Sequence, residues 1–222
     1  MCFAPWISMS TFIIEFMLAL YFLLLNPKDR LNRFIALMSF MLGFYQLSEF
    51  LICVSGANTF TRMALSTTAI LPALACTYAL IMWRKPIKFW NFLLYAPAAA
   101  FMVLFSLPVN LRESATCSQV FIQYPDIGVL FKFFGLYYLV YLFGAVALFY
   151  FTASRARSEP ERRLHYLGML GMFIFTVPTF IFLNFLPALR VQFPSVLCEF
   201  ALLLAIEFIF VLWYKEKHKI KF

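Results

Sequence analysis

The sequence predicts an all-α, polytopic membrane protein, a bundle of seven transmembrane helices with its N-terminus outside and its C-terminus inside. Three observations support this fold class. Of the 222 residues, 64% are hydrophobic and only 13% are charged, whereas about a quarter of the residues in a soluble domain are charged. Seven apolar stretches reach the length of about 20 residues that a helix needs to cross a bilayer. Lysine and arginine gather on one side of these stretches, which predicts the orientation.

The expected spans use nearly the whole chain, so residues 1–222 are expected to form a single transmembrane domain. The spans cover roughly 6–25, 34–55, 62–83, 89–107, 129–152, 164–186 and 194–213. Pro72, Pro97 and Pro178 fall inside the third, fourth and sixth spans, where a proline removes a backbone donor and tends to kink its helix. These prolines are either ordinary members of membrane helices or a means of opening the bundle around a cavity.

The positive charge is distributed unevenly between the two sides of the predicted bundle. Segments 26–33, 84–88, 153–163 and the tail after residue 213 hold 14 of the 18 lysines and arginines. The opposite side holds the other four, which are Arg62, Arg112, Lys132 and Arg190. This bias places the C-terminal side in the cytoplasm. The net charge of +8 is therefore attributed to topology, and no nucleic-acid partner is expected.

The basic tail contains Lys215, Lys217, Lys219 and Lys221. It is expected to contact anionic membrane lipid, with docking of a cytoplasmic partner as the alternative.

Four glutamates, Glu15, Glu49, Glu199 and Glu207, fall inside predicted spans. An ionisable side chain at the centre of a membrane helix costs at least about 2.5–3.5 kcal/mol, so such residues usually have a function. Three of the four lie in the predicted outer half, on spans one, two and seven. For Glu207, alone in the inner half, we expect a protonated carboxyl that hydrogen-bonds to a neighbouring helix.

The outer glutamates belong to polar stripes at helical spacing. Ser8, Thr11 and Glu15 have the same spacing as Gln46, Glu49 and Cys53, and the seventh span adds Ser195 and Glu199. We infer a polar cavity that opens outward between the first, second and seventh helices. It would bind a small hydrophobic or cationic ligand through Ser8, Thr11, Glu15, Gln46, Glu49, Cys53 and Glu199. The alternative is that each glutamate only hydrogen-bonds to a neighbouring helix.

Of the five cysteines, Cys2 and Cys117 are both predicted on the outer side. In an oxidising compartment they could form a disulfide over the mouth of the cavity. A free thiol or a packing role is the open alternative for each. Cys53 and Cys198 lie beside Glu49 and Glu199, where apolar packing is favoured over a soft-metal site.

The residues that are missing from the predicted spans exclude several classes of membrane protein. The only histidines, His165 and His218, lie at the cytoplasmic side, which argues against a three-histidine zinc hydrolase and against an intramembrane serine protease. The seventh span has no lysine to hold retinal. The sequence therefore predicts no cofactor and no metal centre.

Two stretches resemble known proteins. The run NPKDRLNRFIALMSFMLGFYQLSEFL, followed by ILPALACTYALIMW, SEPERRLHYLGMLG and FVLWYK, resembles the seven-span N-terminal sensor region of bacterial histidine kinases and related signalling proteins. The opening MCFAPWIS is similar to small bacterial membrane proteins that begin Met-Cys-Phe-Ser, with Ala4 here in place of the usual serine. These resemblances imply a multi-pass protein of the bacterial inner membrane and single out Cys2, Gln46 and Glu49.

The expected function is that of a sensor or binding module, which holds its ligand in the outer cavity and signals to a separate cytoplasmic partner. A small transporter that loads protons or cations on the intramembrane glutamates is the alternative. An integral-membrane enzyme that modifies lipids, with Cys2 or a glutamate as its reactive group, is a third possibility.

Overall fold

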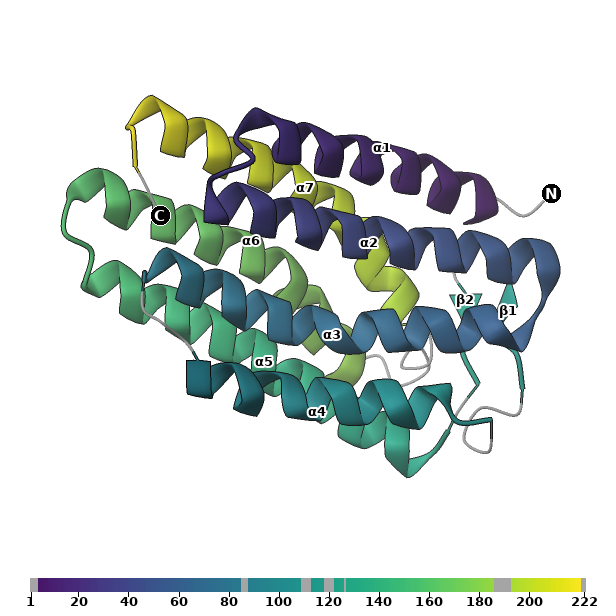
Figure 1. Cartoon of the computed structure of the whole chain (residues 1–222). Coiled ribbons are helices and arrows are strands. Elements are labelled where there is room, and N and C mark those ends of the chain that lie inside the picture. The colour runs from purple at the N-terminus through teal and green to yellow at the C-terminus, as the bar shows by residue number, and fades with distance from the viewer. Residues whose placement is uncertain are drawn as a thin grey trace.

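Each of the seven apolar stretches folds into one long helix. The computed structural model describes residues 4–84, 88–108, 113–117, 122–125, 127–185 and 193–220. Within these residues the helices are α1 (Ala4–Leu25), α2 (Arg30–Ser55), α3 (Asn58–Met82), α4 (Lys88–Ser106), α5 (Val129–Ser154), α6 (Glu159–Asn184) and α7 (Phe193–Lys217), and a two-stranded hairpin joins α4 to α5 (Figure 1). The predicted all-α fold class is therefore confirmed.

Helices α2 and α6 begin before their apolar stretches because polar residues cap them. The Asp29 carboxylate accepts hydrogen bonds from the backbone nitrogens of Leu31 and Asn32, at 3.0 and 3.1 Å, so α2 begins four residues before the apolar stretch. Ser158 caps α6 in the same way by accepting from the Glu161 backbone nitrogen. At the other end of α2, Gly56 adopts the left-handed conformation (φ 64°) that ends a helix and is readily available to glycine.

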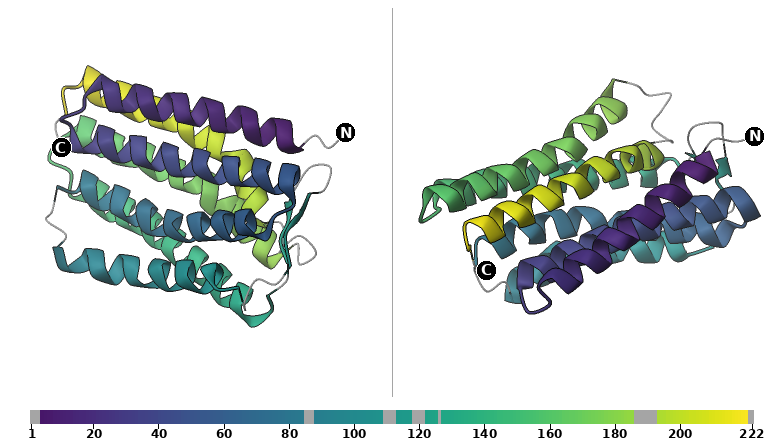
Figure 2. Two further views of the ribbon diagram at one scale, coloured as in Figure 1. Left: turned by 45° about the vertical axis from the view of Figure 1, so that its right-hand side comes forward. Right: turned by 90° about the horizontal axis from the view of Figure 1, so that it is seen from above.

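The helices form two layers. One layer contains α1, α2, α3 and α4 in sequence order, and the other contains α5, α6 and α7 (Figure 1, Figure 2). Consecutive helices run in opposite directions, so the N-terminus and the β1–β2 hairpin lie at one end of the bundle and the C-terminus lies at the other. We name these the hairpin end and the C-terminal end.

Helix α3 forms the centre of the bundle, because its side chains are buried on all sides over most of its length. Aromatic rings fill the space between α4 and α5, where Phe134 makes edge-to-face contacts with Phe101 and Phe105. Glycines on α6 allow close approach to both neighbours. A Cβ atom at Gly168 would lie 2.6 Å from the Phe149 ring on α5, and one at Gly171 would lie 2.7 Å from the Glu207 carboxylate on α7.

The exterior of the bundle is strongly apolar. Large hydrophobic side chains are exposed along the outer faces, including Trp6, Leu24, Val103, Leu136 and Phe210. Within the described residues, α1, α2, α3 and α5 are long and apolar enough to cross a membrane. A water-exposed protein rarely carries so much uncovered apolar surface, and these four helices indicate a membrane protein.

Candidate functional site

At the hairpin end, strand β1 (Thr116–Cys117) pairs antiparallel with β2 (Ile122–Gln123). A disulfide of 2.11 Å between Cys53 on α2 and Cys117 on β1 attaches this hairpin to the helix bundle. The possible bridge from Cys117 to Cys2 is therefore wrong, and Cys2 itself lies outside the described residues. The physical reason is proximity, since the strand lies against the last turn of α2 and brings the two Cα atoms to 5.2 Å.

A buried hydrogen-bond network lies beneath the hairpin. The Tyr45 hydroxyl donates to Glu49 Oε1 at 2.7 Å, and the Tyr124 hydroxyl lies 2.8 Å from the Tyr45 hydroxyl. Because Tyr45 gives its proton to Glu49, Tyr124 is the donor in the second bond. All three side chains are at most 3% exposed. The network thus joins α2 to the segment that follows β2.

One further hydrogen bond holds the hairpin segment on this site. The backbone nitrogen of Ala115, next to β1, donates to the Thr61 hydroxyl of α3 at 3.0 Å. Gln46 is buried on α2 between Tyr45 and Glu49 in sequence. One carboxylate and two phenol groups therefore occupy a small buried region under a covalently attached cap. A carboxylate with neutral hydroxyl groups around it is suited to binding a cation or an amine.

The predicted polar stripe on α1 faces the bundle. Ser8, Thr11 and Glu15 are all buried, and Glu15 is completely enclosed. Its carboxyl group lies against Gly43 of α2, where a Cβ atom would be 3.3 Å from Glu15 Cβ and 3.6 Å from Glu15 Oε2. Neither carboxylate oxygen of Glu15 has a hydrogen-bond partner among the described residues. The stripe is thus buried as expected, but its acid has no hydrogen-bond partner in the part of the chain that the structure describes.

The structure places Glu15 and Glu49 on different sides of α2. Gly43, which contacts Glu15, precedes Glu49 by six residues, and this spacing corresponds to about 9 Å along the helix and about 120° around it. The side chains of Ser195, Cys198 and Glu199 lie outside the described residues. A single cavity that contains all three outer glutamates therefore stays a prediction. Cys53 is used in the disulfide, so its sulfur is not available to a metal or a ligand.

Glu207 on α7 is buried near the middle of the chain's last helix, and its carboxyl group contacts Gly171 of α6. Neither of its oxygens bonds to any residue that the structure describes. The expected interhelical hydrogen bond from Glu207 is therefore wrong for the described part of the chain.

The C-terminal end contains a second buried polar cluster, which the sequence analysis missed. Lys215 of α7 is only 2% exposed, and its ammonium group lies 3.0 Å from Asp29 Oδ1 and donates to Asn32 Oδ1. Glu216 adds a second carboxylate at 3.3 Å. Lys215 had been expected to face lipid with the rest of the basic tail. Instead it connects the end of α7 to the start of α2, and no spacing pattern in the sequence identifies such a long-range pair.

Further polar contacts at the same end join α3 to the α5–α6 turn. Arg84, just after α3, forms an ion pair with Glu161 at 3.2 Å, and the other oxygen of Glu161 accepts from the Arg157 backbone nitrogen at 2.9 Å. The His165 ring lies 3.0 Å from the Thr152 hydroxyl. These contacts fix the turn.

No family model, curated protein or solved structure matches this chain. Within the described residues, no group of three histidine, cysteine or acidic side chains could hold a metal ion. The function must therefore be argued from the two buried polar clusters themselves.

Proposed function

We propose that the chain is a multi-pass membrane sensor module that binds a small cationic ligand at the hairpin end and signals through α2 to the C-terminal end. All seven helices span the membrane in this proposal, with the hairpin end outside. The Cys53–Cys117 disulfide supports this orientation, because disulfides persist in oxidising compartments and are rare in the cytosol. The concentration of 14 of the 18 lysines and arginines near the other end supports the same orientation.

One observation carries the signalling role: α2 holds a buried polar cluster at each end. Glu49 contributes to the cluster under the hairpin, while Asp29 and Asn32 bind Lys215 of α7. Twenty residues separate Asp29 from Glu49, which corresponds to about 30 Å of helix. A shift of α2 at one cluster must therefore change the contacts of α7 at the other, unless the helix bends.

The ligand class follows from the groups that surround Glu49. A cation or an ammonium group that enters the site takes the place of the Tyr45 hydroxyl beside the carboxylate, and the phenol oxygens remain as further acceptors. The hairpin segment that carries Tyr124 then loses its hydrogen bond to α2. Binding in this way changes the contacts of α2 at the hairpin end, while the Cys53–Cys117 disulfide keeps the hairpin attached to the helix.

The test uses the full chain in lipid nanodiscs with tetramethylammonium chloride as the probe and sodium chloride at equal ionic strength as the control. Amide hydrogen exchange is measured on residues 215–220. The probe is expected to change exchange there in the wild type, and Glu49→Gln is expected to abolish the response. Ser55→Ala, an exposed position at the same end of α2, is the matched control and should leave the response intact.

Two outcomes would reject the proposal. If the probe raises thermal stability through Glu49 while exchange at residues 215–220 stays constant, the site binds cations but does not signal. If neither quantity responds to the probe, and no small molecule co-purifies with the protein in native mass spectrometry, the hairpin-end cluster is a structural contact.

A proton- or cation-coupled transporter is the second candidate, because the Glu15 and Glu207 carboxyl groups are buried without a hydrogen-bond partner among the described residues. A group of this kind is neutral when it is protonated or bound to a cation, and proton relays in membrane proteins use such residues. Proton flux into proteoliposomes that depends on Glu15 or Glu207, and is lost in the glutamine variants, would favour transport over sensing.

A further inference from the structure

We propose that a groove between α6 and α7 binds one acyl chain of an acidic phospholipid, whose headgroup lies at Arg163. The groove has a volume of about 650 Å³ and opens on the exterior of the bundle at its C-terminal end. This volume lies within the usual range of small-molecule sites, about 300–1,000 Å³. The site is separate from the hairpin-end cluster and does not depend on the sensor role.

The floor and walls of the groove are apolar and uncovered. Leu170 and Phe173 of α6 face the groove together with Phe210 and Trp213 of α7. More than half of the surface of Leu170, Phe210 and Trp213 is exposed, and Phe173 is 40% exposed. Contiguous apolar surface of this kind marks a place where another apolar group binds. Helices α1, α2, α3 and α5 can span a membrane, and with α6 and α7 spanning it too, as in the proposed function, hydrocarbon chains are the apolar groups that surround this surface.

The length of the groove matches one leaflet of a bilayer. Ten residues separate Arg163 at its open end from Phe173 at its deep end, which corresponds to about 15 Å of helix. This is half of the hydrocarbon thickness of about 30 Å. A groove that begins at the end of the bundle and stops near its middle therefore accommodates a lipid tail from one leaflet.

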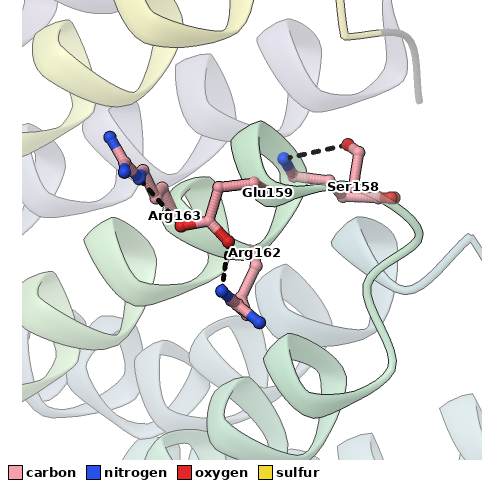
Figure 3. Close-up of polar contacts among 5 residues, drawn as sticks. Ser158, Glu159, Arg162 and Arg163 are labelled. Atoms are coloured by element: carbon pink, nitrogen blue, oxygen red, sulfur yellow. Dashed lines mark hydrogen bonds and ion pairs between the residues drawn. The ribbon is translucent and has the colours of Figure 1, made fainter.

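Charge at the open end selects the headgroup. Among the described residues, the lining contains Arg163 and no acidic side chain. Figure 3 shows the Arg163 guanidinium beside Glu159, whose Oε1 accepts from Arg163 Nε at 3.0 Å, and Arg162 bonds to the other oxygen of the same carboxylate. A guanidinium has five N–H donors, so one bond to Glu159 leaves donors for a phosphate. The glutamate neutralises only one of the two arginines.

A second cation and an aromatic residue flank the same opening from α7. The Lys217 ammonium group lies 4.9 Å from the centre of the Trp213 ring, a cation–π distance. Trp and Tyr side chains collect at the level of lipid headgroups, and Tyr166 and Tyr214 line the groove beside Trp213. An acidic phospholipid complements both parts of this site, since its tail covers the apolar walls and its phosphate faces Arg163 and Lys217.

The experiment is native mass spectrometry of the full chain, released from detergent after incubation with equal amounts of dioleoyl phosphatidylglycerol and dioleoyl phosphatidylcholine. One phosphatidylglycerol is expected to remain bound in preference to phosphatidylcholine. Arg163→Gln should lower this preference about fivefold, since one basic residue near a membrane surface contributes about 1 kcal/mol. Arg162→Gln is the matched control, because Arg162 shares the Glu159 partner but does not line the groove.

A second measurement locates the lipid. The variant keeps Trp213 and has phenylalanine at the other three tryptophan positions. Phosphatidylglycerol brominated on its acyl chain should quench the Trp213 fluorescence more strongly than the same fraction of brominated phosphatidylcholine. Arg163→Gln should equalise the two lipids. Equal retention of both lipids by the wild type, or an equal loss with Arg162→Gln and Arg163→Gln, would overturn the proposal and leave only a general attraction to the basic end.

Discussion

Removing the Cys53–Cys117 disulfide tests both the architecture of the hairpin end and the reasoning about its site. The bridge closes a loop across a sequence separation of 64 residues. In the chain-entropy model a loop of this size stabilises the folded state by about 4 kcal/mol at 25 °C. Helices that remain inserted in the membrane after unfolding already restrict this loop, which lowers the contribution of the disulfide. We therefore expect Cys117→Ser to lower the free energy of unfolding by about 2–4 kcal/mol.

The assay is equilibrium unfolding by a denaturing detergent, with and without reductant, read out by circular dichroism. Wild type under reducing conditions and Cys117→Ser should unfold at the same lower detergent fraction. Cys53→Ser/Cys117→Ser should cost no more than the more destabilised of the two single variants, because either substitution already removes the bridge. Cys76→Ser is the control, since Cys76 is buried and is not in a disulfide, so this variant should keep the full response to reductant.

Two results would refute this reasoning. If reductant leaves the unfolding of the wild type unchanged, the hairpin is not held covalently, and the site beneath it needs another explanation. If peptide mapping of the oxidised protein links Cys117 to Cys2, the arrangement of the hairpin on α2 is wrong. A Cys2→Ser variant distinguishes the two bridges directly, because it should retain the mapped Cys53–Cys117 peptide pair.

Two further predictions concern buried contacts elsewhere in the bundle. Asp29→Asn keeps an N-cap side chain but leaves Lys215 with one carboxylate fewer, so we expect a loss of about 3 kcal/mol in the unfolding free energy. The double variant Asp29→Asn/Lys215→Met also removes the buried ammonium group and should be more stable than Asp29→Asn alone. An additive double variant would show that the two residues are not coupled. Gly171→Ala should cost about 1–3 kcal/mol because the new methyl group overlaps Glu207, whereas Gly144→Ala, with nothing within 4 Å, should be neutral or stabilising. Equal effects of the two alanines would contradict the close contact between α6 and α7.

Sequence patterns were sufficient to predict the helices, because the apolar length that marks a helix of this type is a property of one local segment. Apolar length predicted all seven helices, and the errors at the starts of α2 and α6 came from the capping residues Asp29 and Ser158, which lie outside the apolar stretches. The burial of the α1 stripe that contains Glu15 was also predictable, because a helical period requires only the spacing of residues within one segment.

The partners of the polar residues were not predictable in the same way. Tyr45 is one turn from Glu49, so their hydrogen bond was accessible from spacing. Tyr124 and Cys117 reach α2 only because the segment after α4 turns back as a hairpin. Two residues of strand pairing give no detectable alternation in a sequence. The prediction that Lys215 of the basic tail contacts lipid was wrong for a related reason. A lysine that is buried against another helix looks the same in sequence as one that faces lipid.

The distribution of paired and unpaired acids along the bundle favours movement of α2 over a purely structural role for the polar residues. Acids at the ends of α2 have partners, namely Tyr45 of the same helix for Glu49 and Lys215 of α7 for Asp29, whereas Glu15 of α1 has none among the described residues. Polar groups that only held the helices together would be bonded throughout, because an unpaired buried carboxyl opposes folding. Glu15 instead packs on Gly43, where a Cβ atom would lie 3.3 Å from Glu15 Cβ, so a larger residue at this position would force α1 and α2 apart. Gly43→Leu should therefore block the response of residues 215–220 to a cation while leaving the bonds of Glu49 intact, and an unchanged response in a folded Gly43→Leu protein would show that α2 does not move relative to α1.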